Sequence, residues 1–330
     1  MQRRILGRTG LEVSALSFGC GAVGGLMVRG QQADQERTVA RAIELGINYF
    51  DTAALYGNGE SERNLGRVLK NLGRPAVLVG TKVWIRDREN IGKIITQSLE
   101  ESLRRLGLES VDLFQLHDPI APAGTPDTLD PQIVLGEVVP AFQRLRAQGK
   151  IRHAGFTALG DTAAILSVVD SRMFDTVQAS YNLLNPTGVR AMPGGYPAQD
   201  YERLLARAAQ AGMGTIGIRI LAGGALSATE DRHPLGMPKV EPIGSASTYA
   251  GDVARARRFE DLVRQGHAHS VVEAALRYVI SAPTPATVLV GLSTHDQLEY
   301  AAASVNKGPL SQPALECVAA LQRGFIGEPR

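Results

Sequence analysis

Residues 91–117, IGKIITQSLEESLRRLGLESVDLFQLH, contain one complete repeat of the pattern that decides the fold. Apolar side chains recur at helical spacing from Ile91 to Leu106, and Gly107 then ends the helix. The compact apolar run Val111–His117 follows, as expected for a strand that is buried on both faces. This stretch therefore predicts a helix over Asn90–Leu106 followed by a strand of a parallel sheet.

The same alternation of helix, glycine and strand recurs along the chain. Asp34 is predicted to cap a helix that ends at Leu45, before Gly46, and a helix over Val134–Gln148 ends before Gly149. The predicted strands are Leu16–Gly19, Ile47–Thr52, Val77–Val83, Val111–His117, Ile151–Thr157, Thr176–Ser180, Gly214–Ile220 and Thr287–Gly291. Most begin about 25–40 residues after the previous one, which is the length of one βα unit. The interval from Leu221 to Thr287 is longer and must hold an insertion as well as a helix.

Two α/β folds contain eight such strands: an open doubly wound sheet and a closed (β/α)8 TIM barrel. Gly19, Gly21 and Gly24 form a G-x-G-x-x-G pattern, but the strand before it is short and no helix starts directly after it. The barrel is therefore favoured. Residues 4–6 and 13–15 flank Gly7–Gly10 and predict an N-terminal β-hairpin that plugs the bottom of the barrel. No composition break divides the chain, so a single domain over residues 1–330 is expected.

Charge and composition exclude several classes of protein. The 35 basic and 33 acidic residues give a net charge of +2, which argues against a nucleic-acid or membrane-surface partner. No apolar run approaches the roughly 18 residues of a membrane helix, and no leader segment is evident, so a cytoplasmic protein is expected. Cys20 and Cys317 are too few for a disulfide framework or a zinc site, and no metal is predicted. The sequence defines no oligomeric state.

Ionisable residues end three consecutive predicted strands: Asp51, Lys82 and His117, with Tyr56 one short loop after Asp51. Catalytic residues of such barrels lie at the carboxyl ends of the strands. Asp51 can neutralise a buried Lys82, whose ammonium would lower the pKa of Tyr56 toward the range of a general acid. His117 can donate a hydrogen bond to a carbonyl oxygen. The group suits protonation of an oxygen that gains negative charge, as in hydride addition to an aldehyde or ketone.

Several segments carry a resemblance to the aldo-keto reductase family. They are Leu6–Ser14 (LGRTGLEVS), Phe50–Gly57 (FDTAALYG), Gly80–Lys82 (GTK), Asp112–His117 (DLFQLH), Gly149–Arg152 (GKIR) and Val177–Leu184 (VQASYNLL). The resemblance covers essentially the whole chain. It implies a barrel that binds NADPH or NADH without a Rossmann domain, with Tyr56 as proton donor, Lys82 and Asp51 tuning it, and His117 orienting the carbonyl.

The resemblance also implies where the cofactor binds. Thr157 and Gln178 match residues that hold the nicotinamide carboxamide, although the family asparagine is replaced by Ala158. The stretch 220–226, with Leu221 and Gly223, is similar to the loop that covers the pyrophosphate. Ile218 stands where an aromatic residue commonly stacks on the nicotinamide. Arg219 could reach a phosphate or the substrate, or form a surface salt bridge.

The segment 291–299 resembles the part of the family that receives the adenosine 2′-phosphate. Members selective for NADPH often place lysine and arginine there, whereas this chain has Gly291 and Gln297, with Ser293, Thr294 and His295 as neutral donors. Relaxed cofactor choice is therefore expected, with NADH usable alongside NADPH.

The substrate is expected to be a small carbonyl compound or alcohol. Trp84 is expected to line its pocket, with walls from the loops Ile120–Pro131, Asn185–Asp200 and Ala222–Asp252. No carboxylate-binding arginine is obvious, so a neutral substrate is slightly favoured. Three functions remain open: an aldehyde or ketone reductase, an NAD-linked dehydrogenase of a sugar or other alcohol, and a nucleotide-sensing regulatory subunit.

Overall fold

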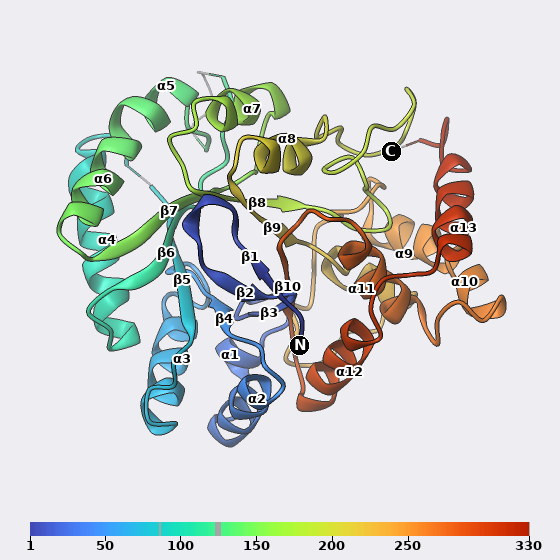
Figure 1. The fold of residues 1–330 in the computed structure, drawn as a ribbon, viewed down its shortest axis with the longest axis horizontal. Helices are drawn as coiled ribbons and strands as arrows, with labels where there is room; N and C mark the ends of the chain where they lie inside the picture. Colours follow the sequence, from blue (N-terminus) through green and yellow to red (C-terminus); the bar gives the residue numbers. More distant parts are fainter. Residues whose placement is uncertain (86, 123–126, 330) are drawn as a thin grey trace.

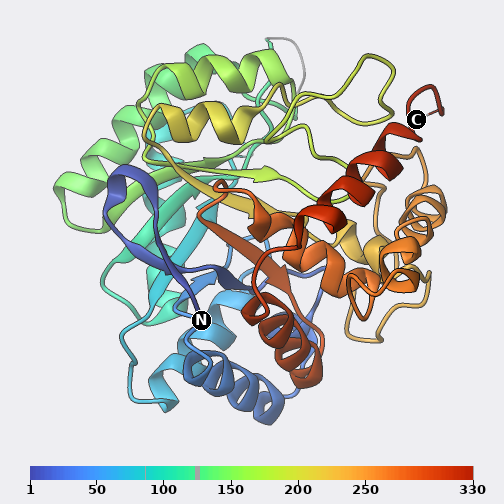
Figure 2. The same cartoon turned by 45° about the vertical axis from the view of Figure 1, so that its right-hand side comes forward.

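The computed structural model describes residues 1–85, 87–122 and 127–329. Eight parallel strands close into a barrel in the order β10-β3-β4-β5-β6-β7-β8-β9, with the helices outside (Figures 1 and 2). The barrel strands are β3 Leu16–Gly19, β4 Tyr49–Asp51, β5 Leu78–Val83, β6 Val111–Leu116, β7 Ile151–Thr157, β8 Thr176–Ser180, β9 Gly214–Ile218 and β10 Thr287–Gly291. The predicted (β/α)8 TIM barrel is thus confirmed.

The helices cover the barrel in chain order. They are α1 Leu26–Arg29, α2 Gln32–Glu44, α3 Glu60–Asn71, α4 Ile91–Leu106, α5 Pro131–Ile133, α6 Val139–Ala147, α7 Thr162–Asp170, α8 Leu204–Gln210, α9 Tyr249–Arg257, α10 Glu260–Arg264, α11 Val271–Ser281, α12 His295–Asn306 and α13 Gln312–Arg323. Short 3-10 segments occur at Gly7–Thr9 and Ala222–Ser227, and a π-helical turn at Val134–Val138. No helix within the described ranges is both long and apolar enough to cross a membrane.

The predicted hairpin lies at the amino-terminal ends of the barrel strands. β1 (Arg3–Ile5) pairs antiparallel with β2 (Glu12–Ser14), and Figure 1 looks onto this end of the barrel. Leu6 and Val13 of the hairpin are fully buried against residues that point into the barrel, including Leu113 and Ile216. The hairpin therefore supplies the apolar floor of the barrel and leaves its opposite end for the site.

Two helix predictions differ from the structure. α2 begins at Gln32 after Gln31, so Asp34 lies within the first turn instead of capping it. A carboxylate in that turn is favourable for the helix dipole, which is why the residue type alone did not separate the two positions. The predicted helix Val134–Gln148 is interrupted by the π-helical turn just before Pro140. Proline lacks the amide hydrogen and clashes with the preceding turn, so a regular α-helix cannot continue through it.

Candidate active site

The four residues predicted to be catalytic lie together at the carboxyl ends of three adjacent strands. Asp51 is the last residue of β4, Lys82 lies near the end of β5, and His117 directly follows β6. Tyr56 comes from the turn between β4 and α3. Within the barrel, Lys82 forms an ion pair with Asp51, and its Nζ lies 3.4 Å from the Tyr56 hydroxyl. The ring centroids of Tyr56 and His117 are 5.8 Å apart, edge to face.

The protonation states follow from this packing. Burial raises the pKa of Tyr56 above its usual value of 10, and the nearby Lys82 ammonium only partly opposes this effect. The direction is opposite to the lowering expected from the sequence, because desolvation outweighs the positive charge. Burial disfavours the charged form of Lys82, yet Asp51 and Tyr56 together raise its pKa. At neutral pH the site therefore presents a protonated tyrosine beside a protonated lysine.

Asp51 is held by more donors than the sequence indicated. Its Oδ2 accepts hydrogen bonds from the Tyr49 hydroxyl at 2.8 Å, from Gln178 Nε2 at 2.6 Å and from Gln115 Nε2 at 3.1 Å. Tyr49 and Gln115 were not predicted as site residues. Each lies two positions before a predicted one (Asp51 and His117), and strand geometry places such residues on the same face. The two-residue repeat of side chains along a strand was therefore the sequence signal that could have identified Tyr49 and Gln115.

His117 faces the cavity in its neutral form. Burial, the Lys82 ammonium and the Arg219 guanidinium lower the pKa of His117 to about 3. Its Nδ1 is buried and has no hydrogen-bond partner among the described residues. Trp84 packs edge to face against His117, with the two ring centroids 5.9 Å apart. Trp84 lines a smaller hollow beside Leu55 and does not contribute to the wall of the main cavity.

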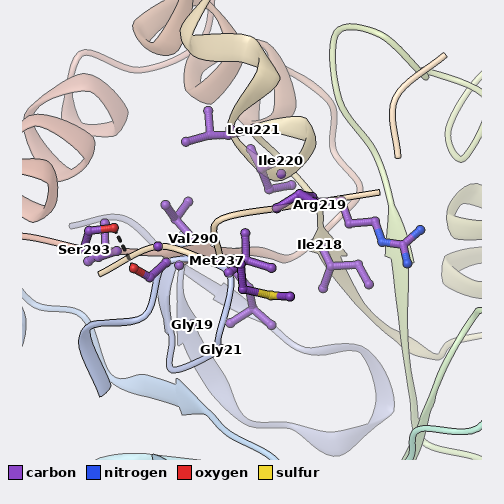
Figure 3. Close-up of a pocket in the computed structure, with 18 of the residues that line it drawn as sticks. Gly19, Gly21, Ile218, Arg219, Ile220, Leu221, Met237, Val290 and Ser293 are labelled. Atoms are coloured by element: carbon purple, nitrogen blue, oxygen red, sulfur yellow. Dashed lines mark hydrogen bonds between the residues drawn. The ribbon is translucent and has the colours of Figure 1, made fainter. Parts of the chain in front are cut away.

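A cavity of about 890 Å³ extends from Tyr56 and His117 across the mouth of the barrel. Its size suits an extended organic ligand. The predicted residues that line it are Thr157, Gln178, Arg219, Leu221, Gly223, Gly291, Ser293 and Gln297. In Figure 3, Ile218 and Arg219 lie on one side of the cavity and Ser293 on the other, with Met237 between them. Ala222–Ser227 and the following stretch, which includes Met237, thus form one wall, as expected for the third predicted loop. The described residues of the first predicted loop (120–122 and 127–131) and the whole second predicted loop (185–200) do not line this cavity, and residues 123–126 lie outside the described ranges.

The cavity lining includes glycines whose role the sequence left open. Gly19, Gly21 and Gly24 form part of the wall, although they do not belong to a Rossmann turn. A Cβ added at Gly24 would lie 2.4 Å from the amide nitrogen of Leu292. Only glycine therefore allows the loop after β3 to lie against the backbone that follows β10. Gly223 and Gly224 have φ values of 68° and 109°, which expose the loop backbone to the cavity.

The lining fits a dinucleotide. Thr157 Oγ1 is buried and has no partner among the described residues, so it is available to a carboxamide. At the other end, the Ser293 hydroxyl donates to the Gly24 carbonyl oxygen at 2.6 Å (dashed in Figure 3), and Gln297 Oε1 accepts from the Ser293 amide. Asp296 also lines this corner of the cavity. Among the described residues that line the whole cavity, Arg219 and Arg232 are the only lysines or arginines. This corner therefore offers little positive charge to a phosphate.

Comparisons with known proteins agree with this site. A model of the Aldo/keto reductase family matches residues 15–322. The chain belongs to the aldo/keto reductase family. Family membership confirms the resemblance seen in the sequence motifs and places the protein among oxidoreductases.

Three individual proteins illustrate the similarity to other aldo/keto reductases. L-galactose dehydrogenase from Arabidopsis thaliana is 32% identical over 316 residues, which cover 93% of this chain and 89% of the relative. The NADH-specific methylglyoxal reductase of Escherichia coli is 31% identical over 205 residues, 56% of this chain and 60% of the relative. The solved holo form of the aldo-keto reductase AKR11C1 from Bacillus halodurans superposes with a TM-score of 0.71 at 26% identity, covering 97% of this chain and 96% of that one.

No group of three or more histidine, cysteine, aspartate or glutamate side chains in the described part of the chain is arranged to hold a metal ion. Cys20 and Cys317 are both free thiols.

Proposed function

We propose that this protein reduces an aldehyde or ketone to the alcohol with NADH or NADPH, and that Tyr56 is the proton donor. The observation that carries the proposal is the connected set of Asp51, Lys82 and Tyr56 beside a neutral His117, in the wall of a cavity whose volume of about 890 Å³ can hold a dinucleotide. Residues 1–330 are proposed to act as one domain, because both ends of the barrel sequence contribute to this cavity.

In the proposed reaction the substrate oxygen lies between the Tyr56 hydroxyl and the His117 imidazole. His117, being neutral, can donate one hydrogen bond to the carbonyl oxygen and polarise it. Tyr56 then donates its proton as that oxygen gains negative charge. Lys82 stabilises the phenolate that forms, and Asp51 keeps Lys82 in place and charged. A nicotinamide dinucleotide held by the cavity residues would supply the hydride that the carbonyl carbon accepts.

The proposed cofactor contacts follow the cavity from one end to the other. Thr157 and Gln178 would hold the carboxamide, Leu221 and Gly223 the pyrophosphate, and Gly291, Ser293 and Gln297 the adenosine end. Gln178 Nε2 already donates to Asp51, so its Oε1 is the atom available to the carboxamide nitrogen. This arrangement would connect cofactor binding to the position of Asp51.

Tyr56→Phe tests the proton donor. The variant removes one hydroxyl and keeps the ring that packs on His117, so turnover should fall by about a thousandfold or more while cofactor affinity stays within about twofold. Steady-state rates and nucleotide-fluorescence titrations measure the two effects. Tyr278→Phe is the matched control, because Tyr278 lies outside the cavity lining. Wild-type turnover in Tyr56→Phe would disprove the assignment.

Use of both nucleotides is the second part of the proposal. The Ser293 hydroxyl is already donated to Gly24, and Asp296 adds negative charge where a 2′-phosphate would lie. The resemblance to a methylglyoxal reductase named as NADH-specific agrees with this. Michaelis constants for NADH and NADPH should therefore be comparable. A preference for NADPH of about a hundredfold or more would contradict the proposal, since it requires strong cationic contacts to the phosphate.

Oxidation of a sugar or other alcohol with NAD⁺ is the second candidate, favoured by the similarity to L-galactose dehydrogenase along 93% of the chain. The same residues serve both directions, because the proton that Tyr56 donates in reduction is the one it accepts in oxidation. Rates in each direction with aldoses, alcohols, aldehydes and quinones distinguish the two candidates. Nucleotide binding without turnover in either direction would instead favour a regulatory subunit.

A further inference from the structure

Arg219 lies at the point where β9 ends and the chain turns over the cavity. Its backbone lies in the left-handed region, with φ +57°, a conformation that residues other than glycine rarely adopt. Asn182 Nδ2 donates to the Arg219 carbonyl oxygen at 2.9 Å and holds this conformation. The residue is half-buried, and its side chain lines the cavity. An arginine kept in an unfavourable backbone conformation at a cavity wall points to a role in binding.

The Arg219 guanidinium is free to bind a ligand. Within the described ranges it makes no ion pair and no hydrogen bond, and Asp231, Glu241 and Asp296, which also line the cavity, do not pair with it. The other arginine of the described lining, Arg232, donates instead to the carbonyl oxygens of Met237 and Gly223 and to the Tyr249 hydroxyl. A planar guanidinium with unused donors matches the geometry of a carboxylate.

The position of Arg219 relates it to the substrate end of the cavity. Its charge is one of the causes, after burial and Lys82, that lower the pKa of His117, so it is felt at the group proposed to bind the carbonyl. In Figure 3 the guanidinium points away from Ser293 and thus away from the proposed adenosine corner. An oxyanion bound by Arg219 would therefore lie on the same side as the reacting oxygen.

We propose that Arg219 binds a carboxylate of the substrate, and that the preferred substrates are carbonyl compounds or alcohols bearing an acid group. This assignment rests on the proposed reaction and names its substrate class. It replaces the slight preference for a neutral substrate drawn from the sequence, where nothing showed that Arg219 lines the cavity and that its charge reaches His117. The competing source of the same chemistry is a phosphate of the dinucleotide, and the experiment separates the two.

The test compares 4-oxobutanoate with its methyl ester, which has the same aldehyde but no charge. Wild-type protein should reduce the acid with the higher kcat/KM. Arg219→Gln should lower kcat/KM for the acid by about 10- to 100-fold and change the ester by less than about twofold, because charge-assisted hydrogen bonds are lost for one substrate only. Arg37→Gln, an exposed arginine on α2, is the matched control. An equal loss for both substrates, or no preference for the acid, would overturn the proposal.

A binding measurement keeps the two proposals distinguishable. Succinate and succinamide are titrated into the NADH complex of each variant, with Trp84 fluorescence as readout. Tighter binding of succinate that disappears in Arg219→Gln supports the carboxylate site even if neither aldehyde is reduced, in which case only the proposed reaction fails. Weaker binding of NADH and NADPH in Arg219→Gln, with unchanged succinate affinity, would show that Arg219 binds a cofactor phosphate and would overturn the carboxylate assignment.

Discussion

Asp51 and Asp118 are both buried carboxylates at the carboxyl end of the barrel, yet their surroundings differ. Asp51 is paired with Lys82 and accepts three further hydrogen bonds. Asp118 accepts from the Ile85 amide at 2.9 Å, and its nearest cation, Arg88, is 3.7 Å away. Burial raises the pKa of Asp118 to about 6, while Ile85 and Arg88 only partly oppose this effect. Burial with only one distant cation therefore decides the pKa of Asp118.

Asp118 should make stability depend on pH in a way that Asp118→Asn removes. The pKa of Asp118 is higher in the folded protein than in the unfolded chain. The contribution of its protonated form to the free energy of unfolding is therefore fully present at acidic pH. It is lost as the pH rises from about 3.8 to about 6. A shift of about two units corresponds to about 3 kcal/mol in the free energy of unfolding. Urea titrations between about pH 4 and 7 should show this fall in the wild type relative to Asp118→Asn. Parallel curves for the two proteins would refute it.

At the scale of elements, the hairpin depends on two glycines with different surroundings. Gly7 and Gly10 both have positive φ, +51° and +68°. A Cβ at Gly7 would lie 2.3 Å from the backbone nitrogen of Gly214, at the start of β9, whereas a Cβ at Gly10 would meet nothing within 4 Å. Both positions require a positive φ, which favours glycine, but only Gly7 also lies so close to the backbone of Gly214 that a side chain would clash.

The two alanine variants should therefore separate these costs. Gly10→Ala should lower the free energy of unfolding by about 1 kcal/mol, the cost of left-handed backbone for a non-glycine residue. Gly7→Ala should lose about 3 kcal/mol or more, because the hairpin must move off β9. Chemical denaturation measures both. Similar losses in the two variants would show that the hairpin is not seated against β9 as described.

The sequence predicts elements best where the local pattern and the tertiary structure agree. β3, β7, β8 and β10 have the predicted bounds because each apolar run stops where its strand stops. β9 ends at Ile218 instead of Ile220, since Arg219 takes a left-handed conformation that residue type does not reveal. The ion pair of Asp51 with Lys82 could be inferred from adjacent strand ends. The hydrogen bond from Gln178 to Asp51 could not, because it spans the interior of the closed barrel.

At the scale of the whole molecule, the cavity forms only when the barrel closes. Gly19 ends the first barrel strand and Gly24 follows it, whereas Gly291 ends the last strand and Ser293 follows it. The two ends of the barrel meet where β10 pairs with β3, and the hydroxyls of Ser17 and Thr287 form a 2.6 Å hydrogen bond across this seam. Loss of one strand would expose two sheet edges and open the cavity, so partial unfolding is costly.

Unfolding should therefore be a single transition of residues 1–330. Trp84, the only tryptophan, packs on His117 and reports the site, while far-ultraviolet circular dichroism reports the surrounding helices. In urea the two signals should have the same midpoint, and NADH should raise both midpoints equally, because it binds only the closed barrel. Ser17→Ala should lower both together by about 1 kcal/mol through loss of the buried seam hydrogen bond. A tryptophan transition that precedes the loss of helix would mean that the site half unfolds separately, and that residues 1–330 do not behave as one domain.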